Sequence, residues 1–123
     1  MTLHESGEDY LETILILEER NGFVRSIDIA NELSFSKPSV SRAVKILREN
    51  EYITVDSKGH INLTDLGRSK AESVYDRHKT LTTALEMLGV SADQAETDAC
   101  RMEHIISEET FQCIKKAVLS KKQ

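Results

Sequence analysis

The segment from Asp98 to His104 concentrates side chains that suit a metal ion. On a helix, Cys100, Glu103 and His104 are spaced at i, i+3 and i+4, so they share one face. That face presents a thiolate, a carboxylate and an imidazole, three ligand types that transition metals favour. Cys100 and His104 could instead act as nucleophile and base, but neighbouring positions on one helix are poor geometry for that chemistry. The spacing therefore favours a metal site.

Two further groups of candidate ligands lie on other predicted helices. Asp9 and Glu12 are spaced at i, i+3 near the N-terminus, and His78 lies on the inward stripe of a long helix. Three separate helices could thus supply ligands to one site. Simpler interpretations remain open: His78 as a hydrogen-bonded core residue, Glu103 and His104 as a solvated pair, and the two N-terminal acids as partners of a helix dipole.

Hydrophobic periodicity predicts the elements that must position these residues. Apolar spacings of three and four predict helices over residues 8–20, 26–33, 37–50, 65–88, 92–106 and 108–119. Ser26 and Ser36 are the predicted N-caps of the second and third helices. Alternation over 52–55 and 60–63, around a turn, predicts a two-stranded hairpin. The order predicts a mainly α fold: a winged helix-turn-helix DNA-binding domain over 1–72 and a helical dimerisation and metal-binding domain over 73–123.

The third predicted helix is a basic stretch in an acidic chain. The 123 residues carry a net charge of −5, yet residues 37–48 hold four bases and no acid. Local charge, rather than the total, sets the footprint of a protein on DNA phosphates. The outward face of this helix carries Ser36, Lys37, Ser39, Arg42 and Lys45.

These residues predict distinct roles on DNA. Arg42 is the predicted base contact, since arginine can bind guanine O6 and N7 through two hydrogen bonds. Lys37, Ser39 and Lys45 are predicted phosphate contacts, which position the protein without reading sequence. At the tip of the hairpin, Lys58 and His60 could contact the backbone or the minor groove. The plainer alternative is a three-helix lobe with solvated charges, which the joint pattern disfavours.

Composition excludes several other classes of protein. No apolar run approaches the roughly 20 residues that span a bilayer, and the first six residues lack a signal-peptide pattern, so a cytoplasmic protein without membrane contact is expected. Two cysteines are too few for a disulfide framework. The length and the lack of glycine-rich loops exclude a Rossmann or barrel enzyme. A non-enzymatic protein is therefore predicted.

Several motifs together resemble the diphtheria toxin repressor family of metal-dependent transcriptional regulators. Residues 98–104 resemble its ligand helix, and residues 8–14 resemble its N-terminal helix. Further matches are to the helix-turn-helix, the wing exit and the start of the dimer domain: residues 28–30, 38–41, 63–67 and 77–78. The resemblance covers about residues 7–120, with the motifs in the same order and at near-identical spacing.

The resemblance implies a function and a ligand set. It implies a homodimer that binds Fe²⁺ or Mn²⁺, with up to two ions per subunit, then binds a palindromic operator and represses metal-uptake genes. It also implies the short, two-domain form. By position, four residues match ligands of the site that joins the two lobes: Asp9, Cys100, Glu103 and His104. Glu12 and His78 match further ligands of the manganese-sensing branch.

The chain mixes features of two branches of this family. The iron-sensing branch usually has Met in place of Asp9 and keeps Cys100, whereas the manganese branch keeps Asp9 and Glu12 and usually has Glu at position 100. Thr82 and Glu96 replace an acid and a histidine of the iron branch's second site. Because a thiolate is softer than a carboxylate, Cys100 slightly favours Fe²⁺, while the carboxylates also suit Mn²⁺.

The last two predicted helices carry more apolar surface than a short lobe can bury, which predicts a homodimer. The residues concerned are Met102, Ile105, Ile106, Phe111, Ile114, Val118 and Leu119. The alternative function is a metal-independent winged-helix regulator, in which the acids and His78 are structural. A third possibility, from another class, is a small thiol enzyme that uses Cys100.

Overall fold

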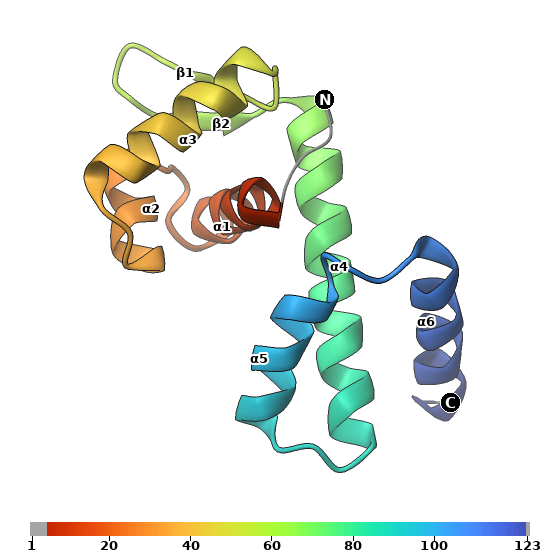
Figure 1. Ribbon diagram of the computed structural model, residues 1–123. Coiled ribbons are helices and arrows are strands. Elements are labelled where there is room, and N and C mark those ends of the chain that lie inside the picture. The colour runs from red at the N-terminus through yellow and green to blue at the C-terminus, as the bar shows by residue number, and fades with distance from the viewer. Residues whose placement is uncertain (1–4, 123) are drawn as a thin grey trace. The chain divides into compact units, whose positions relative to one another are not determined.

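The computed structural model describes residues 5–122, which form six helices and a two-stranded hairpin (Figure 1). The first four residues, part of the segment without a signal-peptide pattern, lie outside this range, as does residue 123. The chain divides into two compact units, residues 1–72 and 73–123. The boundary falls inside the long helix α4, Asp65–Met87. The prediction of a mainly α fold with a winged helix-turn-helix is confirmed.

The first unit places three helices against a hairpin: α1 (Glu5–Asn21), α2 (Ser26–Leu33), α3 (Lys37–Glu49), β1 (Ile53–Val55) and β2 (Ile61–Leu63). The strands pair antiparallel, with Ile53 opposite Leu63. The periodic apolar positions of the helices and strands supply its buried core: Leu11, Ile14, Ile29, Val40, Leu47, Ile53 and Ile61. The 2.7 Å hydrogen bond from the Ile61 N–H to the Val24 carbonyl ties the hairpin to the loop before α2.

The turn between α2 and α3 is tight. Ser34 adopts the left-handed conformation, with φ of 57°, and the Phe35 N–H donates to the Ala30 carbonyl at 3.1 Å. Ser36 then caps α3, because its hydroxyl accepts a hydrogen bond from the Ser39 N–H, as the sequence predicts. Together these hydrogen bonds fix the direction of the chain between α2 and α3.

The predicted cap of α2 is wrong by one residue. Ser26 is the first helical residue, and Arg25 is the N-cap. The reason is Asp28, whose carboxylate accepts a 2.9 Å hydrogen bond from the Arg25 N–H and so satisfies a donor at the start of the helix.

The exit from the wing is closely packed. The Thr64 hydroxyl donates to the Glu51 carbonyl at 2.6 Å and accepts from the Gly67 N–H at 3.1 Å. A side chain at position 67 would overlap the carbonyl oxygen of Tyr52. Glycine at this position therefore lets the first turn of α4 lie directly against the start of the wing.

The second unit contains the rest of α4 with α5 (Ala92–Met102) and α6 (Glu108–Lys122). Its core includes Val74, Leu81, Ala95, Ala99, Phe111 and Val118. Phe111 and Val118, on the predicted buried side of the last helix, are 4% and 7% exposed. Both side chains pack within the subunit.

The predicted helix over 92–106 is wrong beyond Met102. Residues 103–106 form turns, in which the Ile105 N–H donates to the Met102 carbonyl at 3.1 Å. The guanidinium of Arg77 donates to the carbonyls of Glu103 and Ile106, at 3.2 and 2.9 Å. These hydrogen bonds satisfy carbonyls that have no helical partner after the end of α5. They also place Arg77, on α4, beside that end.

Candidate DNA interface and metal centre

The recognition helix α3 separates an apolar face from a polar one. Val40 and Leu47 are buried, whereas Ser36, Lys37, Arg42 and Lys45 are exposed and Ser39 is half-buried. The Ser36 hydroxyl donates to the Ser39 hydroxyl at 2.8 Å, and Arg42 Nη2 donates to the same oxygen at 3.4 Å. The structure thus brings two hydroxyls and one guanidinium together at the start of this helix.

The wing presents Lys58 through a hydrogen-bonded turn. The Asp56 carboxylate accepts from the backbone N–H groups of Lys58 and His60, at 2.8 and 2.9 Å. The His60 N–H is the main reason that the pKa of Asp56 is lowered, and the Lys58 N–H acts in the same direction. Gly59, with φ of 80°, completes the turn and leaves Lys58 exposed at its tip.

Sequence reasoning missed two residues beside the wing. The Phe23 ring stacks on the His60 ring at a centroid distance of 5.1 Å, and Arg25 Nη2 lies 3.4 Å from His60 Nε2. Phe23 and Arg25 lie in the loop before α2, 35 residues or more from His60 in sequence. The pattern of charges along the chain offers no signal for this cluster; the one local feature is an aromatic residue two positions before an arginine.

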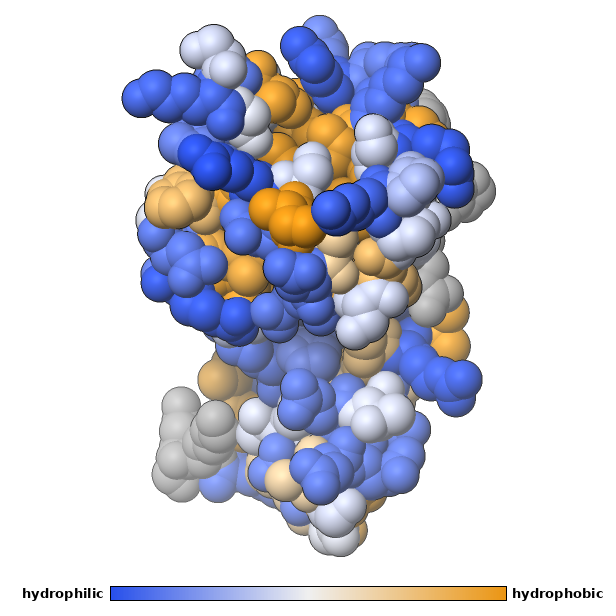
Figure 2. All heavy atoms as spheres, turned by 90° about the vertical axis from the view of Figure 1, so that its left-hand side faces the viewer, coloured by the Kyte–Doolittle hydropathy of each residue, from blue (hydrophilic) through white to orange (hydrophobic). Residues whose placement is uncertain are grey.

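The outer surface is mainly hydrophilic on the face that Figure 2 presents, with apolar atoms visible between charged and polar side chains. Exposed apolar residues of the first unit include Phe23, Ile27, Phe35 and Ile46. A surface that mixes cations, hydroxyls and a few apolar groups suits DNA, whose backbone is polar and whose bases also offer apolar contacts.

A buried carboxylate lies between two imidazoles in the second unit. His78 Nδ1 is 2.9 Å from one Glu103 oxygen, and His104 Nε2 is 3.3 Å from the other. The side chains of Glu103 and His104 are 0% and 1% exposed, and that of His78 is 20% exposed. A charged group so deeply buried requires strong partners. The structure therefore brings both histidines to Glu103, and within the same unit a ligand atom of Cys100 also lies within 4.8 Å of one of Glu103.

Local structure explains this arrangement. His78 follows Arg77 on α4, and the Arg77 guanidinium donates to the carbonyl of Glu103, the C-cap residue of α5. The same guanidinium pairs with the Glu108 carboxylate at 2.8 Å, at the start of α6. One arginine thus fixes the backbone on both sides of His104. The sequence motif places these ligands on one helix, but a turn carries Glu103 and His104.

The remaining predicted ligands belong to α5 and α1. Cys100 is exposed on α5, one turn before Glu103. Asp9 is half-buried and Glu12 is 8% exposed, both on α1 of the first unit. Thr82 donates its hydroxyl to the His78 carbonyl at 2.7 Å. Thr82 therefore supports the backbone of a candidate ligand.

The donor set around Glu103 fits a divalent transition metal. Two imidazole nitrogens and a carboxylate are common ligands of iron, manganese and zinc ions. Buried histidines that bind metals are usually oriented by further hydrogen bonds to nearby groups. Within this unit, ligand atoms of His78 and of Cys100 each lie within 4.8 Å of one of Glu103, so Glu103 is the donor that these groups share.

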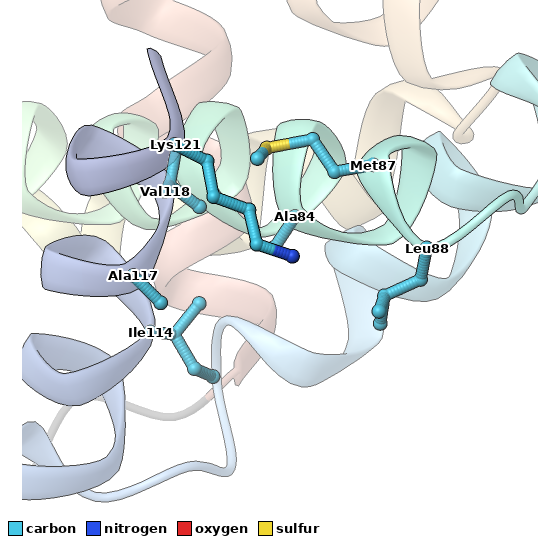
Figure 3. A pocket seen from close by; sticks show the side chains of 7 residues that line it. All are labelled: Ala84, Met87, Leu88, Ile114, Ala117, Val118 and Lys121. Atoms are coloured by element: carbon cyan, nitrogen blue, oxygen red, sulfur yellow. The ribbon is translucent and has the colours of Figure 1, made fainter. Parts of the chain in front are cut away.

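An apolar groove of about 190 Å³ lies between the end of α4 and α6 (Figure 3). It is lined by Ala84, Met87, Leu88, Ile114, Ala117, Val118 and Lys121. Leu88 is 76% exposed, and Ile105 and Leu119 elsewhere in this unit are 75% and 53% exposed. Such exposure of large apolar side chains is typical of a surface that contacts another chain.

The fold and the site define a winged helix-turn-helix regulator with a helical metal-binding unit. Residues 2–61 match the iron dependent repressor N-terminal DNA binding domain, and residues 64–121 match the iron dependent repressor metal binding and dimerisation domain. The chain belongs to this family, the diphtheria toxin repressor family of metal-dependent transcriptional repressors. Its members are DNA-binding regulators and not enzymes, so the predictions of family and of a non-enzymatic protein are confirmed.

Individual relatives show the same relationship. The chain is 36% identical over 102 residues to the regulator MntR of Geobacillus kaustophilus, covering 83% of this chain and 72% of that protein. It is 32% identical over 115 residues to a helix-turn-helix transcriptional regulator of Methanocaldococcus jannaschii, covering 92% of each.

Solved structures agree. The manganese regulator SloR matches with a TM-score of 0.81 at 31% identity, over 96% of this chain and 54% of that one. IdeR of T. acidophilum matches with a TM-score of 0.80 at 25% identity, over 89% and 52%. The chain therefore spans about half the length of these structures. Among residues 5–122, no helix is long and apolar enough to cross a membrane.

Proposed function

We propose that this chain binds Fe²⁺ or Mn²⁺ and then binds a palindromic DNA operator, repressing genes of metal-ion homeostasis. The observation that carries the proposal is the buried Glu103 carboxylate held between His78 and His104. These groups belong to the part of the chain that matches a metal binding and dimerisation domain. A recognition helix with an exposed cationic face lies in the same chain.

The proposed ligand set combines groups from both units. His78, Glu103, His104 and Cys100 come from the second unit, and Asp9 and Glu12 come from α1, for one or two ions per subunit. The ion supplies positive charge that offsets these carboxylates and the thiolate. In its absence, the anionic groups of α1 and those of the second unit repel each other. Metal binding is thereby linked to the arrangement of the units, as in other ligand-biased switches.

The proposed choice of metal rests on Cys100. A thiolate is a softer ligand than a carboxylate, so its presence shifts preference from Mn²⁺ toward Fe²⁺. Asp9, Glu12 and Glu103 are hard oxygen ligands and retain affinity for Mn²⁺. We therefore favour Fe²⁺ slightly over Mn²⁺, although the names of the relatives MntR and SloR associate those proteins with manganese regulation.

The proposed DNA contacts follow the layout of α3 and the wing. Arg42 contacts a base edge, and Ser36, Lys37, Ser39 and Lys45 contact the backbone near the start of the helix. Lys58 contacts the backbone from the tip of the wing. Because the target is a DNA operator, we place the protein in the cytoplasm.

A homodimer completes the proposal, because two copies related by a two-fold axis present two recognition helices to a palindrome. Exposed Leu88, Ile105 and Leu119 supply apolar surface for association. Sedimentation velocity at micromolar concentration, with and without metal, is expected to show a dimer. A monomer under both conditions contradicts this part of the proposal.

DNA binding under anaerobic conditions tests the central claim. Double-stranded DNA is selected from a random-sequence pool with Fe²⁺ or Mn²⁺ present, and affinity is then measured by fluorescence anisotropy while each metal is titrated against a chelator. We expect tight binding with metal and at least a tenfold loss with chelator. Binding that the chelator leaves unchanged supports the metal-independent regulator instead.

A further inference from the structure

The loop before α2 and the wing meet in a compact cluster of Phe23, Arg25 and His60. The Phe23 and His60 rings stack with an interplanar angle of 28°, and the Arg25 guanidinium carbon lies 5.7 Å from the centre of the Phe23 ring. Arg25 Nη2 is 3.4 Å from His60 Nε2. The backbone bond between Ile61 and Val24 fixes the two segments in register. The cluster is therefore part of the folded unit.

The charge of Arg25 is not neutralised within this cluster. Arg20, Arg68 and Arg77 each pair with a carboxylate at 2.9 Å or less. Among the residues that the structure describes, no carboxylate oxygen lies within 4.0 Å of the Arg25 guanidinium. The Asp28 carboxylate accepts from the backbone N–H of Arg25. The guanidinium of Arg25 is thus exposed, with no carboxylate partner among the described residues.

The surroundings of His60 explain how Arg25 is held. His60 Nδ1 lies 3.6 Å from an Asp56 oxygen, while Nε2 faces Arg25. A neutral imidazole with its proton on Nδ1 can donate toward Asp56 and accept from Arg25 at once. The Phe23 ring supports the guanidinium through a cation–π contact. A guanidinium ordered in advance loses less conformational entropy when it binds a phosphate.

The place of Arg25 in the motif suits a phosphate. In helix-turn-helix proteins the first helix of the motif crosses the DNA backbone while the second enters the major groove. Arg25 is the N-cap of α2, the first helix of this motif. On the other side of the cluster, the wing carries exposed Lys58. Two cations thus flank one edge of the DNA-binding unit.

We infer that Arg25 is a further DNA-binding residue, which contacts a backbone phosphate, and that Phe23 and His60 are positioning residues for it. The inference rests on the proposed DNA-binding function and deepens it. Phosphate contacts set register and affinity without reading bases. Arg25 should therefore strengthen binding to operator and random DNA alike.

The salt dependence of DNA affinity tests Arg25. Arg25→Gln is compared with Arg20→Gln, a matched exposed arginine of the same unit, in the full chain with metal bound. Each lost phosphate contact should reduce the slope of log K against log salt by about 0.9, hence by about 1.8 for a dimer. We expect that reduction for Arg25→Gln on both kinds of DNA, and an unchanged slope for Arg20→Gln. Equal slopes for wild type and Arg25→Gln overturn the inference.

A second pair of variants tests the positioning role. Phe23→Leu should weaken DNA binding several-fold at an unchanged salt slope, because Arg25 keeps its charge but loses its support, whereas Phe23→Tyr should retain wild-type affinity. Equal affinity for Phe23→Leu and Phe23→Tyr removes Phe23 from the inference. If wild-type protein with metal binds none of the selected DNA, the proposed function itself is overturned. If wild-type protein binds and Arg25→Gln has the same affinity and salt slope, only this inference is overturned.

Discussion

His78 Nδ1 lies 2.9 Å from a carboxylate oxygen of Glu103, although 25 residues separate them in sequence. The contact joins α4 to the turn at the end of α5, and the Arg77 guanidinium holds the backbone of that turn. The carboxylate is buried and also lies near His104. Glu103 thus approaches candidate ligands from two elements of the second unit, which makes it the most informative residue to change.

Glu103→Ala should leave a folded dimer that no longer responds to Fe²⁺ or Mn²⁺. The substitution removes a buried anion that lies between two imidazoles, and no described neighbour in this unit replaces its charge at that point. Anaerobic metal titration of DNA binding by anisotropy is the measurement. Glu109→Ala, at an exposed acid on α6, is the control and should respond normally. A full metal response in Glu103→Ala would contradict the proposed metal site and favour a metal-independent regulator.

Cys100→Glu should shift activation from Fe²⁺ toward Mn²⁺ without loss of DNA binding. The change exchanges a soft anion for a hard one of similar reach on α5. The ratio of the metal concentrations at half-maximal DNA binding, measured anaerobically, reports the shift. Cys113→Ser changes the other exposed thiol and should keep the wild-type ratio. An unchanged ratio in Cys100→Glu removes Cys100 from the proposed ligands.

Arg42→Ala should relax operator preference, whereas Lys37→Ala should weaken binding to all sequences alike. A two-bond contact of arginine with guanine is worth about 1–3 kcal/mol of discrimination. Lys37 is exposed in the first turn of α3, where a phosphate contact affects mainly the salt slope. The ratio of operator to random-DNA affinity is measured for both variants. If Arg42→Ala keeps the wild-type ratio, Arg42 does not read bases.

Asp56→Asn should reduce the loss of stability in acid. Backbone N–H groups, chiefly that of His60, hold the pKa of Asp56 below its ordinary value of 3.8. The ionised carboxylate therefore stabilises the fold above pH 3.8, and this stabilisation is lost as the pH falls through the lower, folded-state pKa. Urea unfolding midpoints between pH 7 and about 2.5 should fall less in Asp56→Asn than in wild type. Parallel curves for the two proteins contradict this role.

Gly67→Ala should destabilise the first unit by about 1–3 kcal/mol, the usual cost of forcing extra atoms into a packed site. The added methyl group would overlap the Tyr52 carbonyl, so the start of α4 must move away from the wing. The free energy of unfolding is measured by urea denaturation. Ser69→Ala, at an exposed position two residues further along α4, should change it by less than about 0.5 kcal/mol. If Gly67→Ala and Ser69→Ala have the same free energy of unfolding, Gly67 is not closely packed against Tyr52.

Much of the fold was predictable because its signals are local. Apolar spacing located α3 and α4 to within a residue or two, and the alternation over 52–55 and 60–63 located the hairpin. The exposed face of α3 follows from the same spacing, since Val40 and Leu47 must be buried together. The motifs along the chain also identified the family, because order and spacing of residues are properties of the sequence itself.

The end of α5 and the Phe23–His60 cluster were decided only by the tertiary structure. Spacing alone extended the helix past Glu103, but residues 103–106 form turns, and Arg77, on another helix, donates to the carbonyls of Glu103 and Ile106 there. Phe23 and His60 meet only because Ile61 pairs with Val24. The sequence by itself determined which residues could serve as ligands and which helix face is polar, since both depend on near neighbours. Which side chains meet across 25 or more residues depends on packing and on distant hydrogen-bond partners, which only the folded chain supplies.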